Sequence, residues 1–197
     1  MKVGIFVMKN IIIMKNLLKF IIIILICIPV FLTSILIITN GNLKYTEEIE
    51  IQKSITIVDR LFGDIYNMVK YMPTTKSVLL TKGADYVNGA EYQIIITMGE
   101  EEMEMKATLI NYNLPDSITF IYEVPGVVNT VTQKHLFISE NKTLIINEQE
   151  FQFSGLMKII AFFEPKGFNI ESFRKQSKIY LNSFKNFVEN YTTTIYI

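Results

Sequence analysis

Tryptophan is absent from this 197-residue sequence, and cysteine and histidine each occur once. The single cysteine, Cys27, excludes a disulfide within the chain and any zinc site built on several cysteines. The single histidine, His135, likewise excludes a metal centre that draws several imidazole ligands from one chain. We therefore expect neither a metal site nor a cofactor.

Net charge is also lacking, because 19 basic and 19 acidic residues balance across the whole sequence. Four lysines lie before residue 20, and no acidic residue occurs before Glu47. Without those four lysines the rest of the chain has 15 basic and 19 acidic residues, a net charge of −4. Nucleic-acid surfaces need clustered positive charge, so we expect no nucleic-acid partner.

One long apolar run stands out against this background. Residues 20–38 read FIIIILICIPVFLTSILII and contain no charged side chain. A helix of this length rises about 28 Å, close to the roughly 30 Å of a bilayer's hydrocarbon layer. Pro29 is compatible with this reading, since proline is tolerated within membrane helices. We predict a transmembrane anchor over 20–38, preceded by a basic segment over 1–19.

A cleaved signal peptide is the alternative reading of the same run. It would need a shorter apolar region that ends in small residues, whereas Ile and Leu continue to Ile38. Cys27 follows ILI, so a lipoprotein cleavage site has little support. Lys2, Lys9 and the other early lysines keep the N-terminus in the cytoplasm by the positive-inside rule. We expect a single-pass protein with its domain outside, and a start at Met8 or Met14 would leave the run intact.

The rest of the chain alternates between strand and helix patterns. A short polar linker is predicted over 39–44, a strand from Tyr45, and then two short helices whose apolar spacing is interrupted at Gly63. Turn signals such as NLPD and PG separate six further runs, at 76–82, 90–98, 103–112, 117–124, 127–138 and 143–153. Short connections between neighbouring strands favour an antiparallel meander.

The last predicted element is a long amphipathic helix over about residues 170–191. Its apolar stripe has steps of three and four and consists of Ile170, Phe173, Ser177, Tyr180, Phe184, Phe187 and Tyr191. A tail over 192–197 follows. We predict an α+β fold in which a curved antiparallel sheet of about seven strands wraps around this helix, with a space between them.

Three segments carry a family resemblance. They are EIEIQKSITIVDRLFGDIYNMVKYMPTTKSVLL, with RLF on the first short helix and YMP before the second strand, the glycine-led GAEYQI, and the closing SFRKQSKIYLNSFKNFVEN. Their order and spacing resemble the START-like, or SRPBCC, helix-grip superfamily, most closely its polyketide cyclase/dehydrase type. The resemblance covers about residues 44–190 and departs from the superfamily at Tyr71, where tryptophan is frequent. It implies a ligand-binding domain over 45–191.

Charged residues indicate which face of each strand lies outside, because side chains alternate across a strand. Glu104 on one strand and Glu123, Lys134 and Glu148 on the next three mark the outer face. Together with the last helix, the opposite positions form the predicted binding site: Met103, Met105, Phe120, Tyr122, Asn129, Gln133, His135, Asn147, Gln149, Ser177 and Tyr180.

Hairpin register gives a check on these faces, since opposed residues in an antiparallel pair share a face. A two-residue turn at Pro125 and Gly126 sets Tyr122 opposite Asn129, both inward. A three-residue loop at ENK would oppose Ser139 to Thr143, His135 to Asn147, and Gln133 to Gln149. The two hairpins thus predict a polar patch on the concave face, with His135 and Asn147 facing the long helix.

An apolar space with a few convergent polar groups is the usual form of a small-molecule site. The leading hypothesis is a membrane-anchored domain that binds an apolar or amphipathic molecule, such as a lipid, between the sheet and the last helix. One alternative is a cyclase- or dehydrase-like enzyme with His135 as general base and Tyr122 as donor to an oxyanion. It ranks lower because the sequence places no carboxylate to orient His135. The other alternative is a structural or protein-interaction module with a solid interior.

Overall fold

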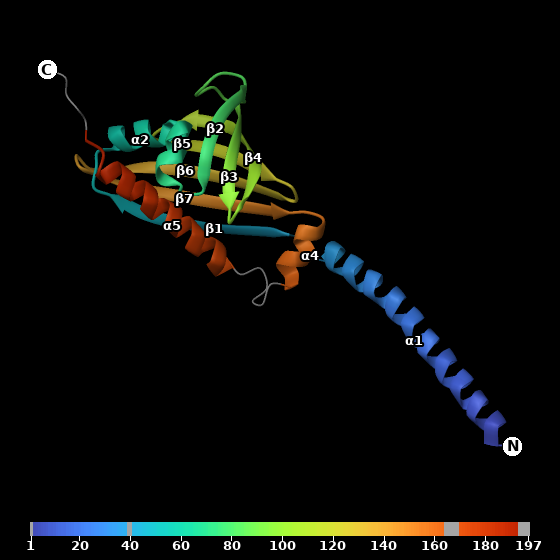
Figure 1. Cartoon of the computed structure of the whole chain (residues 1–197). Coiled ribbons are helices and arrows are strands. Elements are labelled where there is room, and N and C mark those ends of the chain that lie inside the picture. The colour runs from blue at the N-terminus through green and yellow to red at the C-terminus, as the bar shows by residue number, and fades with distance from the viewer. Residues whose placement is uncertain (1, 39–40, 164–169, 193–197) are drawn as a thin grey trace.

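The apolar run lies within one continuous helix, α1 (Lys2–Ile38), which leads away from the folded domain (Figure 1). The chain is seen here in a computed structural model, which describes residues 2–38, 41–163 and 170–192. Within α1, Met14–Ser34 is long and apolar enough to cross a membrane, and none of its residues is buried within the protein. No helix boundary separates the predicted basic segment from the predicted anchor.

Seven strands form one antiparallel sheet in the order β1-β7-β6-β5-β4-β3-β2. The strands are β1 (Asn42–Ile51), β2 (Thr75–Lys82), β3 (Glu91–Met98), β4 (Glu101–Asn113), β5 (Ser117–Val124), β6 (Val127–Ser139) and β7 (Lys142–Phe153). The predicted meander from β2 to β7 is confirmed, and β1 extends the sheet beyond β7. Because β1 begins at Asn42, half of the predicted linker belongs to the sheet, and residues 39 and 40 lie outside the described residues.

The helices follow the predicted order with one addition. After β1 come α2 (Ile55–Gly63), a 3-10 turn at Ile65–Asn67 and α3 (Met68–Tyr71), and the last helix of the described residues is α5 (Ile170–Glu189). The addition is α4 (Leu156–Phe163), an apolar helix of sequence LMKIIAFF that was not predicted. Of the predicted tail, residues 193–197 lie outside the described residues.

The curved sheet packs its concave face against α5 and the short helices (Figure 1). The buried stripe of α5 is Ser177, Leu181, Phe184 and Val188. Tyr180, which was predicted for this stripe, is half-buried beside it, and Leu181 takes the fully inward position. Burial of a side chain such as Phe184 stabilises the fold by about 1.5–3 kcal/mol. This arrangement is the predicted helix-grip architecture.

Candidate ligand-binding site

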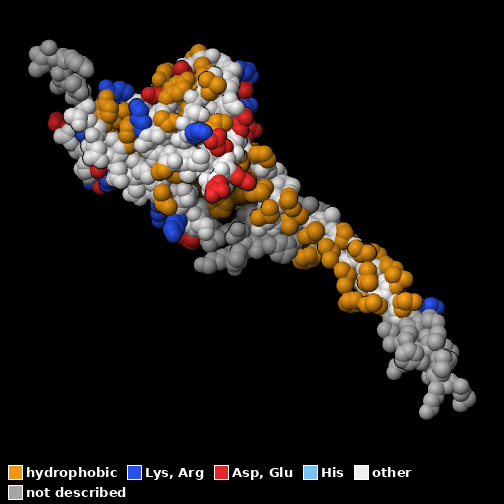
Figure 2. Space-filling model, in the orientation of Figure 1, with side chains coloured by type: hydrophobic (Ala, Val, Ile, Leu, Met, Phe, Trp, Pro, Cys, Tyr) orange, Lys and Arg blue, Asp and Glu red, His pale blue; other side chains and the backbone are white. Residues whose placement is uncertain are grey.

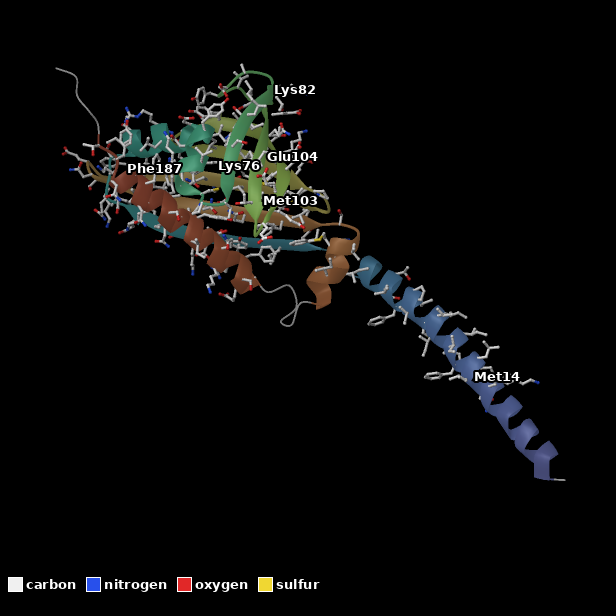
Figure 3. All side chains as sticks on the ribbon, in the orientation of Figure 1. Met14, Lys76, Lys82, Met103, Glu104 and Phe187 are labelled. Atoms are coloured by element: carbon white, nitrogen blue, oxygen red, sulfur yellow. The ribbon has the colours of Figure 1, made fainter. Side chains whose placement is uncertain are left out.

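Inward-facing side chains change from buried to half-exposed along the strands. Near α2 the inward residues are buried, among them Leu109, Ile118 and Ile145. Towards the other end of the same strands they are half-exposed, and we call this set the open end: Met103, Met105, Tyr122, Val127, Asn129, Val131, Gln149 and Phe151. The gradient holds along β4, β5 and β6, whereas on β7 it stops at Phe153, which is buried in a small apolar cluster with Leu43 and Tyr45. The open end is therefore the region of the concave face between that cluster and the main core. In Figure 3, Met103 lies on the side of the domain nearer α1 and Phe187 on the side away from it.

The open end lies beside α4. The β5-β6 turn packs directly on this helix, because a Cβ atom added to Gly126 would lie 2.6 Å from Cγ of Met157. The backbone N–H of Ser154 also donates to the carbonyl oxygen of Gly126 at 2.9 Å. Since α4 in turn contacts α1, the open end is the end of the domain from which the apolar helix leaves (Figure 1).

A continuous line of hydrogen bonds, here called the polar network, crosses the concave face from the open end to α2. Asn129 Nδ2 donates to Gln149 Oε1 at 2.9 Å, and Gln149 Nε2 donates to Asn147 Oδ1 at 2.6 Å. Asn147 Nδ2 then donates to Gln133 Oε1 at 3.2 Å, and Gln133 Nε2 lies 3.0 Å from Nε2 of His135. The predicted polar residues therefore meet one another.

The network ends on a residue that the sequence did not suggest. Nδ1 of His135 lies 2.5 Å from Oδ1 of Asp59, which is on α2. The expectation that no carboxylate orients His135 was wrong, because Asp59 is 76 positions away in the sequence and only the docking of α2 brings it close. The imidazole also meets the ring of Phe62 edge-on, with centroids 5.5 Å apart. His135 is inward and only 2 % exposed, but it faces α2, whereas α5 was predicted.

The β6-β7 register differs from the prediction by two residues. Ser139 pairs with Lys142, so the loop has two residues, and the pairing shifts between Phe137 and Ser139. Beyond that irregularity His135 opposes Ile145, and the opposed polar pair is Gln133 with Asn147. The predicted opposition of Gln133 to Gln149 was also wrong, since Gln149 opposes Val131. The β5-β6 turn is as predicted, with Tyr122 opposite Asn129.

Two polar atoms at the open end have no protein partner among the described residues. Oδ1 of Asn129 is buried and accepts no hydrogen bond. The hydroxyl group of Tyr122, on the directly opposed residue, also makes none in the described part of the chain. Burial raises the pKa of Tyr122, so its hydroxyl keeps its proton and remains a donor at neutral pH. A buried acceptor without a donor is destabilising by about 1–3 kcal/mol, which makes Asn129 a place for a ligand or water.

The other predicted site residues lie outside the polar network, some at the open end and some in buried positions. Met103 and Met105 are half-exposed at the open end, whereas Phe120 is buried beside Tyr122, with ring centroids 5.8 Å apart. Ser177 is buried and its hydroxyl lies 2.9 Å from the hydroxyl of Tyr45, so it joins α5 to β1. Tyr180 is not drawn into the polar network by any described hydrogen bond.

One buried charge was also not predicted. Glu47 on β1 is 6 % exposed, and its carboxylate accepts from Nε of Arg174 on α5 at 2.5 Å. Nζ of Lys178 lies 3.5 Å from the other oxygen. A signal was present in the sequence, because Glu47 shares its strand face with Tyr45, Ile49 and Ile51.

Two depressions lie on other surfaces of the described residues. One, of about 450 Å³, lies on β1, β7 and β6 and includes charged outer-face residues such as Lys44, Glu148 and Glu150. The other, of about 680 Å³, lies between α3 and the end of α5 beside Tyr71 and Phe187. Neither contains the polar network beyond Gln149, so neither corresponds to the predicted site.

The sequence matches no family model and no curated protein. Solved structures do match its fold. An aromatase/cyclase from a Streptomyces species aligns with a TM-score of 0.61 and 10% identity, covering 75% of this chain and 94% of that one. A START superfamily protein from Mycobacterium smegmatis aligns with a TM-score of 0.61 and 9% identity, covering 76% and 99%.

A third structure extends the comparison. Norcoclaurine synthase from Thalictrum flavum, solved with dopamine and hydroxybenzaldehyde, aligns with a TM-score of 0.56 and 12% identity, covering 78% of this chain and 90% of that one. The domain therefore has the same helix-grip fold as these solved structures. It follows an apolar N-terminal helix of the length that a membrane span needs.

Proposed function

We propose that this domain binds an apolar or amphipathic small molecule at the open end of its concave face. The observation that carries the proposal is the gradient of exposure among inward side chains, which are buried near α2 and half-exposed near α4. Two Met, two Val and one Phe supply five of its eight residues, and Tyr122, Asn129 and Gln149 are its polar groups. An apolar surface with few polar groups is the usual form of a small-molecule site.

The anchor is the second part of the proposal. Residues 20–38 of α1 span the membrane, the N-terminus lies in the cytoplasm and the domain lies outside. On the face that Figure 2 shows, hydrophobic side chains line most of the described part of α1. On α4, Leu156 and Ile160 are 68% and 46% exposed, and this helix lies between α1 and the open end. Together they support a binding site that opens towards the bilayer and exchanges ligands with it.

Two observations weigh against the alternatives. Both ring nitrogens of His135 are engaged, one by Gln133 and one by Asp59, which leaves neither of them to take a proton from a ligand. We therefore assign His135 a positioning role. A structural module with a solid interior is disfavoured by the half-exposed inward residues on four strands.

Native mass spectrometry of the full chain, released from detergent micelles after mild purification, tests the binding proposal. A small molecule should copurify with the wild type. Val131→Trp, which fills the open end, should lose it, whereas Thr132→Trp on the outer face of the same strand should retain it. Because the chain has no tryptophan, each variant also carries its own fluorescent reporter of folding. Consistently empty wild-type protein that also gains no thermal stability from a lipid panel would refute the proposal.

Protease added to intact cells tests the topology. The domain should be digested without lysis, while the short N-terminal segment is protected. Digestion of the domain only after lysis would show that the orientation is reversed.

A further inference from the structure

We propose that Oδ1 of Asn129 selects ligands that carry a hydrogen-bond donor, a hydroxyl or amine group, and that Asp59 sets this preference from the far end of the polar network. The inference rests on the proposed function, since it concerns the same open end. It adds the chemistry of the ligand's polar group and names Asp59 as the residue that determines the preference for that group.

The direction of the network begins at Asp59. An aspartate carboxylate has only acceptor atoms, so the short contact to His135 requires a proton on Nδ1 of the imidazole. In a neutral imidazole the other nitrogen, Nε2, then has only a lone pair to offer. Gln133 must therefore turn its NH2 group, and not its oxygen, towards His135.

The orientation of the Gln133 amide determines the orientation of each amide that follows it in the polar network. With its NH2 group on His135, Gln133 presents its oxygen to Asn147, whose NH2 group must donate. Asn147 in turn presents its oxygen to Gln149, and Gln149 presents its oxygen to Asn129. A side-chain amide has one carbonyl and one NH2 group, so the four orientations are coupled, and reversing one in isolation would set two donors or two acceptors against each other.

The last group of the network is the oxygen of Asn129. It is buried, it accepts nothing, and it is on the half-exposed face. A ligand hydroxyl or amine would give it the missing donor. A ligand with only an ether or carbonyl oxygen at that point would set two acceptors together and leave Asn129 unpaired. The polar network thus acts as a relay that presents an acceptor at the open end.

Two fluorescent probes of nearly equal size separate these cases, namely 2-naphthol, which has a hydroxyl group, and 2-methoxynaphthalene, in which that hydroxyl is methylated. The full chain is titrated with each in the same detergent micelles. The preference is the ratio of the two dissociation constants, and comparing that ratio between variants cancels partition into the detergent. We expect the ratio of the dissociation constant of 2-methoxynaphthalene to that of 2-naphthol to be about tenfold higher in wild type than in Asn129→Leu.

Asp59→Asn tests the relay from its far end. An amide at this position can donate to or accept from Nδ1, so both directions of the polar network become accessible. The preference for 2-naphthol should then fall towards that of Asn129→Leu, although residues 59 and 129 lie at opposite ends of the network. A merely structural role of Asp59 would weaken both probes alike and leave the ratio unchanged. Glu104→Gln, on an exposed outer position of β4 (Figure 3), is the matched carboxylate-to-amide control and should keep the wild-type ratio.

The outcomes separate the two proposals. Equal ratios in wild type and Asn129→Leu would overturn this inference and leave the binding site standing. A wild-type ratio in Asp59→Asn would overturn the relay but not the acceptor. Absence of binding by both probes in wild type would count against the proposed function and this inference together. Asn129 is half-exposed, so Asn129→Leu keeps the test available even if Asp59→Asn fails to fold.

Discussion

Asp59 and His135 join the first short helix to the centre of the sheet through a single contact of 2.5 Å between a carboxylate oxygen and Nδ1 of the imidazole. The histidine side chain is fully buried, while that of the aspartate retains 20% of its exposure. The contact is therefore reached from the surface on one side only. It holds α2 on β6 and at the same time completes the hydrogen bonding of a buried imidazole.

Asp59→Ala should destabilise the fold by about 1–3 kcal/mol, because it leaves the buried N–H of His135 without an acceptor. Unfolding of the full chain in micelles, followed by circular dichroism, measures this free energy. Asp116→Ala, in the exposed turn before β5, is the control and should change stability by less than about 0.5 kcal/mol. Equal effects of the two substitutions would contradict a stabilising role for the contact.

The inward and outward faces of the strands could be predicted from the sequence, but the register of β6 and β7 could not. A two-residue loop without any irregularity would have set Gln133 opposite Glu148 and turned a carboxylate inward. The extra residue at Ile138 restores the alternation, because burying that charge costs more than one bulge. The outer charges Lys134 and Glu148 thus determined the correct face, although the loop length assumed for the hairpin was wrong.

Asp59 and α4 show what the sequence pattern does not contain. Asp59 lies on a helix whose other side chains predict only an amphipathic element, and its partner is defined by how that helix packs on the sheet. The segment that forms α4 is apolar at seven of its eight positions, so only Lys158 marks an outer face, and so short an apolar run does not distinguish a helix from a buried strand. Tertiary contacts with the β5-β6 turn and α1 give it its place.

The pair of Glu47 and Arg174 should respond asymmetrically to substitution. Arg174→Met leaves a buried carboxylate with only Lys178, at 3.5 Å, as a cation, whereas Glu47→Gln leaves a neutral amide that still accepts from the guanidinium. We expect Arg174→Met to be the more destabilising of the two. Urea unfolding of both variants in micelles measures the difference, with Lys175→Met on the exposed side of α5 as control. The reverse order would show that the carboxylate is well hydrated.

Stability should fall at alkaline pH through Tyr71. Burial raises the pKa of this phenol in the folded state, and no described hydrogen bond holds its hydroxyl. Below pH about 10 the phenol is neutral in both states, so the stability is fully present; above it only the unfolded chain releases the proton, and stability is lost as pH rises through the folded pKa. Tyr71→Phe should therefore match wild type at neutral pH and exceed its melting temperature above pH about 10. A constant difference across this range would contradict the assignment.

Gly126 in the β5-β6 turn and Gly99 in the β3-β4 turn form a matched pair for measuring how firmly α4 packs beside the open end. Gly126 and Gly99 both have positive φ, at 81° and 68°, so an alanine at either position carries the same left-handed strain of about 1–2 kcal/mol. They differ in their surroundings. A Cβ atom at Gly126 would meet Met157 of α4 at 2.6 Å, whereas one at Gly99 would meet nothing within 4 Å.

Gly126→Ala should therefore destabilise the fold more than Gly99→Ala, and the excess reports the packing of the turn on α4. Met157 is a flexible side chain, so α4 should shift and not unfold. Amide hydrogen exchange should quicken in α4 for Gly126→Ala while that of α5 is unchanged, and Gly99→Ala should leave both helices as in wild type. Identical exchange in the two variants would mean that α4 does not rest on this turn, and the placement of α4 beside the open end would lose its basis.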